Sequence, residues 1–568
     1  MGRLLRHRSL AIIAAVAVSC GGVAACSSGS STGTGTGGNS SSSSSSTLTM
    51  ESSPETTITQ AFNPYLATQA AYGMGATGLI YEPLVQFDLA KPTVQYPWLA
   101  TSYAWADGGK QITFTIRQGV KWNNGTPLTA ADVAYTFDLV KANASINLGG
   151  LTISSVSTSG NTVTLTFPTS QYTNLEQIAG TAIVPKAIWS KAGNPGTFAN
   201  PNPVGTGPYM LGTFTPQGFT LKKNPYYWQP SKVKVSKVYF PVYTSNTGAL
   251  NALFSGQITW TGNYIPGLKT EFVDKAPAYH HYWEAAGGDE SFEPNLTKWP
   301  TNQLAVRQAI SLAVDRTLLG KEGEAGLENP VVNATGITLP TFSAWSAPVA
   351  NMTISPTGNP AAAEKVLEAA GFTKGSNGFF QKGGKTVSIT IISPSAYTDM
   401  AEVDSIATQE LKAAGIDASF QGLAVTAWAQ DVADGDFQMT EHWSNGGITP
   451  YSMYDGWLDS KLASSSAATG DYERLNDPAV ESDLATLAGA NTLAQQTADL
   501  VPLEKYVAAN LPVIPVETAA EWFEYNSQNF VGWPTQSNPY DSGQPSGTNN
   551  GPGSGTDEVV MLHLSPRT

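Results

Sequence analysis

Residues 441–460, EHWSNGGITPYSMYDGWLDS, combine aromatic rings with a neutral amide and two adjacent glycines. The groups of interest belong to Trp443, Asn445, Gly446, Tyr451 and Trp457. Flat rings stack on the apolar C–H faces of sugars, whereas amide and accessible backbone groups hydrogen-bond to hydroxyls. The stretch therefore predicts a site for a neutral, hydroxyl-rich ligand, although core packing is an equal alternative for any one Trp taken alone.

Carboxylate pairs elsewhere offer a catalytic alternative, because glycoside hydrolases flank the scissile bond with two acids. The candidates are Asp431, Asp434 and Asp436, or Glu402 and Asp404. The first group surrounds a glycine turn and the second lies on an amphipathic helix, so solvent-exposed faces explain both. Residues 29–33, GSSTG, match the hydrolase motif G-x-S-x-G only formally, because no strand precedes them and no helix follows. We predict that the protein is not an enzyme and keep a secreted glycoside hydrolase as the alternative.

The chain also contains no pattern that indicates a metal or a nucleotide. It has five His, of which His280 and His281 are adjacent. Adjacent residues on a strand point to opposite faces, so this pair is poorly placed to share one ion. Residues 73–78, GMGATG, match G-x-G-x-x-G but follow no clear strand, as a dinucleotide site would require. We expect neither a metal nor any other cofactor.

The first 25 residues are typical of an export signal that ends at a lipid-attachment site. Three arginines within the first eight residues precede an apolar run at 10–19 that is too short for a stable membrane anchor. The Val-Ala-Ala before Cys26 resembles the bacterial lipobox, in which cleavage leaves the Cys lipidated; Cys20 is a weaker match, and ordinary secretory cleavage is the alternative. Residues 26–46 are a Ser/Gly/Thr tether that cannot bury a core. We expect lipid anchoring at Cys26 on the extracytoplasmic face of a bacterial cell membrane.

Composition excludes several classes of protein. The formal net charge of −14 argues against nucleic-acid binding, which needs clustered Lys and Arg. Only 13% of the residues are charged while 10% are aromatic, a balance suited to neutral or amphipathic ligands. Both Cys lie in the export region, so the folded part has no disulfide. No later run approaches about eighteen apolar residues, the length of a membrane span.

Strand and helix patterns alternate along the rest of the chain. Period-two alternation predicts strands at 110–122, 161–168 and 386–393. Start signals predict helices after a capping box at Thr129, after Asn359-Pro360 and from Glu402 onward. Such alternation over more than 500 residues is typical of mixed α/β lobes rather than one core.

In chain order, these motifs resemble those of the family 5 extracellular solute-binding proteins, the oligopeptide, dipeptide and nickel receptors of ABC importers. The resemblance is carried by LIYEPL at 79–84, PWLA at 97–100, FTIRQGVKW at 114–122, NGTPLTAADV at 124–133, VGTGPY at 204–209, NPYYW at 224–228, VRQAI at 306–310 and AVDR at 313–316. The matches extend from about residue 50 to residue 540, nearly the whole mature chain. Their order makes the combined signal specific.

The resemblance implies an α/β, two-lobed periplasmic-binding-protein-like fold (type II, cluster C) with an inserted domain and a hinge that closes around ligand. Lobe I would combine 47–85, 200–298 and 521–568, domain II would cover 86–199, and lobe III would cover 299–520. Such a receptor performs no chemistry; ligand favours the closed form, which a membrane permease recognises. The implied partners are ABC permease and ATPase subunits and a small extended ligand, and the protein itself is expected to be a monomer.

The resemblance also bears on the ligand. Peptide receptors of the family hold the α-amino group with an acid that follows a Trp of lobe III; here that Trp is Trp443 and no acid follows it. The GGITPY run at 446–451 and FVGWPT at 530–535 resemble the cello-oligosaccharide-binding branch. Both observations favour a neutral β-linked oligosaccharide, but peptides are the commoner ligands in the family. We therefore expect an oligopeptide-type or similar extended ligand and keep the oligosaccharide as the alternative. The predicted ligand-binding residues are Trp428, Trp443, Asn445, Gly446, Tyr451, Trp457, Trp260 and Trp533.

Overall fold

A computed structural model describes the ranges 47–52, 58–66, 73–147, 149–463, 468–545 and 556–567. The predicted export signal, the tether, Cys20 and Cys26 lie outside these ranges, as does the GSSTG run. Within the described ranges, none of the helices combines the length and the apolar character that crossing a membrane demands.

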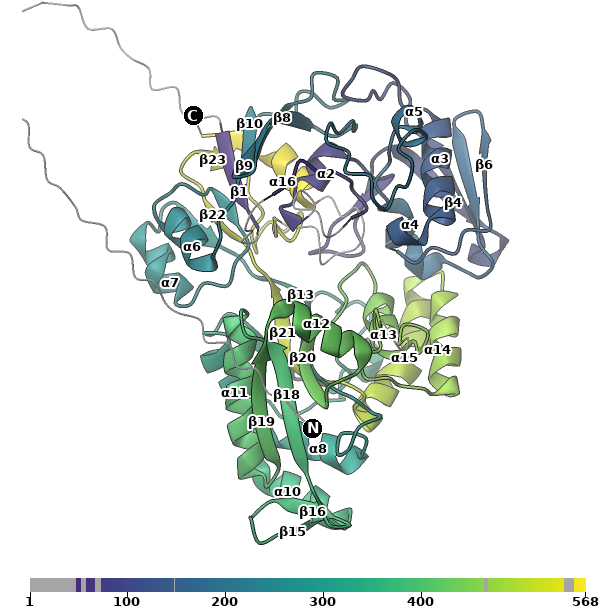
Figure 1. Cartoon of the computed structure of the whole chain (residues 1–568). Coiled ribbons are helices and arrows are strands. Elements are labelled where there is room, and N and C mark those ends of the chain that lie inside the picture. Colours follow the sequence, from purple (N-terminus) through teal and green to yellow (C-terminus); the bar gives the residue numbers. More distant parts are fainter. Residues whose placement is uncertain are drawn as a thin grey trace, which may run out of the picture. The chain divides into compact units, whose positions relative to one another are not determined.

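The largest sheet has seven strands drawn from distant parts of the chain (Figure 1). Its order is β12 (His280–Tyr282), β22 (Glu524–Asn526), β11 (Trp260–Thr261), β1 (Thr47–Glu51), β10 (Lys237–Pro241), β9 (Gly218–Lys223) and β8 (Tyr209–Thr215). The central strand β1 runs parallel to β10 and to β11, and the other pairs are antiparallel. Leu48 and Met50 of β1 alternate into the core beneath it.

A four-stranded antiparallel sheet forms within residues 100–166. Its order is β4 (Ala100–Ala106), β5 (Gln111–Ile116), β7 (Thr162–Thr166) and β6 (Ser155–Ser159). The predicted alternation is confirmed in β5, where Ile112, Phe114 and Ile116 are buried. Helix α3 (Ala130–Ala142) covers this sheet, and it begins with the predicted capping box, in which the backbone N–H of Thr129 donates to Asp132 Oδ2 at 3.0 Å.

The second large sheet is mixed and has six strands. Its order is β14 (Asn329–Pro330), β21 (Ile514–Glu521), β13 (Ala285–Pro294), β20 (Met439–Trp443), β18 (Ser388–Pro394) and β19 (Asp417–Leu423). β18 is parallel to β19 and β20, and the pairs that involve β13 and β21 are antiparallel. Helices α8 (Leu304–Ala313), α10 (Pro360–Ala369) and α11 (Thr398–Ala413) pack with this sheet (Figure 1). As predicted, Asn359 caps α10, its Oδ1 accepting from the Ala362 N–H at 3.0 Å.

The remaining elements are short or lie around the sheets. The other helices are α2 (Thr77–Ile80), α4 (Leu175–Ala179), α5 (Lys186–Trp189), α6 (Asn246–Phe254), α7 (Leu268–Glu271), α9 (Arg316–Leu318), α12 (Val425–Asp434), α13 (Tyr451–Leu458), α14 (Pro478–Ala488), α15 (Leu493–Asn510) and α16 (Thr556–His563). The 3-10 turns are η1 (Asp107–Gly109), η2 (Ala144–Ile146), η3 (Tyr172–Asn174), η4 (Val273–Lys275) and η6 (Ala347–Val349), and η5 (Leu319–Gly323) is a π-helical turn. The small sheets comprise β2 (Val85–Phe87) with β3 (Gln95–Pro97), β15 (Thr373–Lys374) with β16 (Phe380–Lys382) and β17 (Lys385–Thr386), and β23 (Phe530–Val531) with β24 (Ser565–Pro566).

The chain passes between the two large sheets at two short connections. Trp283-Glu284 joins β12 to β13, and Trp522-Phe523 joins β21 to β22. The connections are bonded to each other: the Trp283 N–H donates to Phe523 O at 3.1 Å, and the Phe523 N–H donates to Glu284 Oε2 at 3.2 Å. The first change of sheet therefore falls at Ala285, inside the range 200–298 assigned to lobe I, and the domain boundaries stay a prediction.

Candidate ligand-binding cavity

A cavity of about 840 Å³ lies next to the two connections. Its lining comes from segments 244–246, 262–264, 396–400 at the start of α11 and 519–522 at the end of β21. It also includes Gly287, Gly288 and Glu290 of β13, Trp443 at the end of β20, Ser444 and Gly446 just after it, and Ser52, Val425 and Gln544. Cavities of a few hundred to about 1,000 Å³ are typical of small-molecule sites. Both large sheets thus contribute to one concave site.

Aromatic rings line the cavity in two pairs. The four rings belong to Tyr264, Tyr397, Trp443 and Trp522. The Trp443 ring centroid lies 6.5 Å from that of Tyr397, and the Tyr264 centroid lies 5.6 Å from that of Trp522. Offset and edge-on rings at these distances stabilise one another and leave faces free to stack on a ligand.

Trp443 is supported from behind by two further rings. The ring of His442 is stacked at 4.5 Å from Trp443, and Trp428 lies 5.4 Å from His442. Burial lowers the pKa of His442 to about 4, so the imidazole is neutral at ordinary pH. The Trp428 Nε1–H donates to Thr440 Oγ1 at 2.9 Å, which fixes this ring. Trp428 therefore positions Trp443 without lining the cavity itself.

The polar part of the lining consists of hydroxyl, amide and carboxyl groups. Hydroxyls and amides come from Ser52, Thr244, Ser245, Asn246, Asn263, Thr398, Ser444 and Gln544, and carboxyls come from Glu290, Asp399 and Glu521. Among the described residues, none that lines the cavity is Lys or Arg. An anionic group of a ligand would find no cationic partner here.

The three carboxyls were missed by the sequence analysis. Burial raises the pKa of Glu290 to about 8, and the charges of Asp399 and Asp404 add to the effect; burial also raises the pKa of Asp399. The Glu290 carboxyl both donates and accepts hydrogen bonds when it is protonated and only accepts them when it is ionised. The acids come from β13, α11 and β21, which are far apart in the chain, so no local motif marks them and only the tertiary structure brings them together.

Glycines of β13 let other groups approach the cavity closely. A Cβ at Gly287 would lie 2.1 Å from Glu521 Oε1, and a Cβ at Gly288 would lie 2.8 Å from Ser444 Oγ. A larger residue at either position would displace a group of the lining. The sequence AAGG at the start of β13 is thus part of the site.

The loop after Trp443 is hydrogen-bonded to helix α4, which follows the four-stranded sheet in the chain. The Ile448 N–H donates to Oε2 of Glu176, a buried residue of α4, at 3.0 Å. Burial raises the pKa of Glu176 to about 8. A Cβ at Gly447 would lie 2.5 Å from Ser452 Oγ and 3.1 Å from Glu176 Oε2. In the Gly-Gly pair, Gly446 therefore lines the cavity, and Gly447 allows the loop to pack closely against α4 and α13.

The structure separates the predicted ligand-binding residues into two groups. Trp443 and Gly446 line the cavity, and Trp428 lies directly behind Trp443. Asn445 is exposed outside the lining, where its Nδ2 lies 2.3 Å from the position that a Cβ would take at Gly456. For the first group, ligand binding stays a prediction.

Of the other four, three are buried in hydrophobic cores and Tyr451 packs against one. Tyr451 and Trp457 belong to α13 and pack in the core around Phe342, Leu484 and Leu503. Trp260 and Trp533 lie in the core at the seven-stranded sheet, with ring centroids 5.6 Å apart. Their indole N–H groups donate to Gly543 O at 2.8 Å and to Phe530 O at 3.1 Å. We do not propose these four as ligand contacts.

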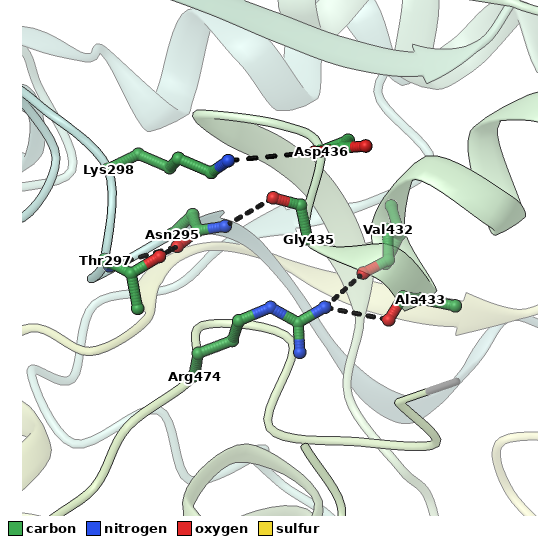
Figure 2. A network of polar contacts seen from close by, with 8 residues as sticks. All are labelled: Asn295, Thr297, Lys298, Val432, Ala433, Gly435, Asp436 and Arg474. Atoms are coloured by element: carbon green, nitrogen blue, oxygen red, sulfur yellow. Dashed lines mark hydrogen bonds and ion pairs between the residues drawn. The ribbon is translucent and has the colours of Figure 1, made fainter. Parts of the chain in front are cut away.

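The acids considered for glycoside hydrolysis do not flank the cavity. Figure 2 shows that the turn after α12 is held by a structural network: Asp436 pairs with Lys298 Nζ at 3.7 Å, and Asn295 Nδ2 donates to Gly435 O at 3.1 Å. In the same network, Arg474 donates to the carbonyls of Val432 and Ala433 (Figure 2). The acids Asp431, Asp434, Asp436, Glu402 and Asp404 are all absent from the lining.

The weaker motifs have structural explanations too. His280 stacks on Phe272 at 4.2 Å, whereas His281 Nε2 contacts Ser527 Oγ at 3.1 Å, so the two rings face different partners. In the GMGATG run, a Cβ at Gly75 would lie 1.9 Å from Pro545 O. The chain itself fills the space next to this glycine.

Comparison with solved structures defines the class of protein. The periplasmic oligopeptide-binding protein of an oligopeptide ABC transporter from Thermotoga maritima matches with a TM-score of 0.83 at 24% identity, covering 92% of this chain and 99% of that one. The same protein with bound mannohexaose gives a TM-score of 0.79. The oligopeptide-binding protein AppA from Bacillus subtilis, in complex with a nonapeptide, gives 0.71 at 18% identity, with 92% and 99% covered. The predicted fold, a mixed α/β periplasmic binding protein of the oligopeptide-binding type, is confirmed.

The sequence comparisons identify the family. The model for bacterial extracellular solute-binding proteins, family 5 Middle, matches residues 95–465, and the chain belongs to this family. The nickel-binding periplasmic protein of Escherichia coli K12 is 27% identical over 457 residues, covering 77% of this chain and 82% of the relative. The periplasmic oligopeptide-binding protein OppA of the same strain is 24% identical over 461 residues, covering 74% and 78%.

Family membership settles the broad role. Family 5 proteins are binding receptors rather than enzymes, so the prediction that the chain is not an enzyme is confirmed. The protein is an extracytoplasmic solute-binding protein of an ABC importer, a role that implies a permease partner and a small ligand.

Proposed function

We propose that the protein captures a neutral, hydroxyl-rich oligosaccharide in the cavity and delivers it to the permease of its ABC importer. The composition of the lining carries this proposal: four aromatic rings lie among hydroxyl, amide and carboxyl groups, and no described residue of the lining is Lys or Arg. Aromatic faces stack on the apolar faces of sugar rings, and the polar groups satisfy hydroxyls in both directions. The carboxyl of Glu290 adds a further hydrogen-bonding group to the lining.

Two further observations support a sugar. No acid follows Trp443 at the position where peptide receptors of the family hold the α-amino group; Ser444, Asn445 and Gly446 stand there instead. The similar protein from Thermotoga maritima holds mannohexaose, so this fold accommodates a linear oligosaccharide.

An oligopeptide is the second candidate. Glu290, Asp399 and Glu521 line the cavity, and any of these carboxyls could accept hydrogen bonds from an α-ammonium group. Relatives named as oligopeptide-binding proteins favour this ligand as well. Against it, the terminal carboxylate of a short peptide would be buried without a cation.

Calorimetry on the purified protein separates the two candidates. We expect β-linked gluco- and manno-oligosaccharides to bind, whereas tri- and tetrapeptides bind weakly and equally well with a free or an acetylated amine. Trp443→Phe serves as the matched control for Trp443→Ala, because Phe retains a ring for stacking. Tight binding of peptides that is lost on acetylation would contradict the sugar proposal and favour the peptide.

We further propose that the protein acts as a lipid-anchored monomer together with permease and ATPase subunits. The lipobox-like stretch before Cys26 and the polar tether after it support the anchor. Cys26→Ser should move the protein from the membrane fraction to the medium, whereas Cys20→Ser, the matched control, should leave it on the membrane. The opposite result would assign the lipid to Cys20, and gel filtration of the released protein tests the monomer.

A further inference from the structure

Four glutamates meet in the wall of the six-stranded sheet. Carboxylate oxygens of Glu290, Glu324, Glu328 and Glu517 all lie within 4.8 Å of one another. Glu290 of β13 is directly opposite Glu517 of β21, so both side chains project from the same face. Glu328 immediately precedes β14, and Glu324 follows the π-helical turn η5. These four residues are called the glutamate cluster below.

The oxygens of the glutamate cluster are largely without partners. Within the described part of the chain, both oxygens of Glu324 and Glu517 and Oε2 of Glu290 and Glu328 accept no hydrogen bond. Glu328 Oε1 alone has a backbone donor, the N–H of Ala520 at 2.7 Å. Glu324 and Glu517 are at most 1% exposed. Burying carboxylates in this state is costly unless something supplies positive charge.

The protein supplies little positive charge at this place. The charge of Arg316 acts on Glu517, but its guanidinium donates to Pro515 O at 2.8 Å, to Ser311 O at 3.0 Å and to Ser311 Oγ at 3.1 Å. None of the ion pairs found among the described residues includes a member of the glutamate cluster. The hydrogen bonds of Arg316 thus go to neutral oxygens.

The side chain of Glu441, which is not one of the four, projects from the same face of the sheet as the glutamate cluster. Glu441 of β20 lies two residues before Trp443, which is opposite Glu290, so Glu441 shares the face of the glutamate cluster. It is 0% exposed, and neither of its oxygens has a partner within the described residues. An unpartnered buried carboxyl beside the four indicates a missing positive species.

We propose that the glutamate cluster binds one hard divalent cation, for which Ca²⁺ is the fitting ion. Ca²⁺ takes six to eight oxygen ligands at about 2.3–2.6 Å, so two of its ligands lie at most about 4.6–5.2 Å apart, and oxygens that all lie within 4.8 Å of one another can share such an ion. Mg²⁺ requires shorter contacts, and the absence of nitrogen and sulfur from these four side chains disfavours nickel and zinc. Four carboxylates, some bidentate, supply enough oxygens.

The position of the glutamate cluster links this ion to the cavity. Glu290 lines the cavity and is partly exposed, which gives the ion a route from solvent. Tyr264, also in the lining, donates its hydroxyl to Gly323 O at 3.2 Å, one residue before Glu324. A Cβ at Gly320 would lie 3.1 Å from Glu517 Oε1, so η5 approaches the glutamate cluster closely. The ion would therefore order a turn that contacts the opposite wall of the cavity.

Calcium titration of the purified full-length protein after EDTA treatment tests the proposal without any sugar or peptide. Calorimetry near neutral pH should show one saturable Ca²⁺ site per chain, and Ca²⁺ should raise the unfolding temperature more than Mg²⁺ does. Glu517→Gln should weaken Ca²⁺ binding by at least about tenfold, since even second-shell changes cost that much. Glu504→Gln is the matched control, because Glu504 is equally buried with both oxygens unpartnered but lies on α15 outside the glutamate cluster.

A second variant keeps the test decisive. Glu290→Gln changes the partly exposed member, so it should fold even if Glu517→Gln does not, and circular dichroism checks both. No saturable Ca²⁺ binding by the wild-type protein would overturn the proposal. Equal losses in the Glu504→Gln and Glu517→Gln variants would overturn it as well. If the wild type binds no Ca²⁺ and Glu517→Gln raises the unfolding temperature, the glutamate cluster holds protons instead of a cation.

Discussion

Replacing Glu176 by Gln should remove part of the pH dependence of stability. Glu176 lies in α4 at 5% exposure, and its Oε2 accepts the Ile448 N–H at 3.0 Å. Burial raises its pKa from 4.5 to about 8. Gln has nearly the same shape and can still accept from Ile448, but it carries no titratable proton.

The sign and the magnitude follow from linkage between protonation and folding. The folded protein holds the Glu176 proton more tightly than the unfolded chain does, so this contribution to stability is fully present below pH 4.5 and is lost as the pH rises through about 8. Each pH unit within this window costs about 1.36 kcal/mol. Between pH 5 and pH 7 the loss from Glu176 is therefore about 3 kcal/mol.

Denaturant unfolding of the wild type and of Glu176→Gln at both pH values measures this quantity. We expect the wild type to lose about 3 kcal/mol more unfolding free energy than the variant between pH 5 and pH 7, while other buried carboxyls contribute equally to both proteins. Glu402→Gln, at an exposed position, controls for the substitution itself. If wild type and Glu176→Gln show the same pH slope, the assignment of a retained proton to Glu176 is wrong.

Two further predictions use matched pairs. Trp443→Ala should weaken ligand binding by about 1–3 kcal/mol in calorimetry, as the loss of an aromatic anchor does. Trp457→Ala should leave the affinity unchanged and lower the unfolding free energy by about 3–5 kcal/mol, because Trp457 lies in a core. Equal effects of the two variants on affinity would refute the assignment of Trp443 to the site and Trp457 to the core. Gly435→Ala should destabilise the protein more than Gly371→Ala does. Both glycines have a positive φ, of 74° and 82°, so the backbone strain is similar. Only at Gly435 would the added Cβ meet another group, Arg474 Nε at 2.1 Å. Thermal unfolding compares the two, and equal losses would show that the clash contributes nothing.

Local signals predicted those elements whose ends are fixed by side chains. The capping box at Thr129 and the Asn359 cap placed the starts of α3 and α10, because these contacts involve residues adjacent in sequence. The start of α11 was placed at Glu402 although the helix begins at Thr398; its N-cap residue, Tyr397, makes no side-chain cap. The strand at 386–393 likewise begins at Ser388, because Lys385-Thr386 pair with β16 instead.

The candidate site was only partly predictable, since its lining comes from segments far apart in the chain. Trp443 and Gly446 carried a local signal of aromatic and small residues. Glu290 and Asp399 carried no such signal, and they lie on a strand and a helix far apart in the chain, so their convergence required the tertiary structure. Ring type alone also does not distinguish a cavity wall from a core, which explains why Trp260, Trp457 and Trp533 were included.

The paired connections at Trp283-Glu284 and Trp522-Phe523 restrict how the protein can move. Two short covalent links that are hydrogen-bonded side by side resist sliding and leave bending about one axis as the soft degree of freedom. A bend of this kind acts as a lever: a small change in backbone angle beside the cavity becomes a large displacement at the ends remote from it. Fluorophores on β6 and on the β15–β16 hairpin would therefore report ligand capture without touching the site.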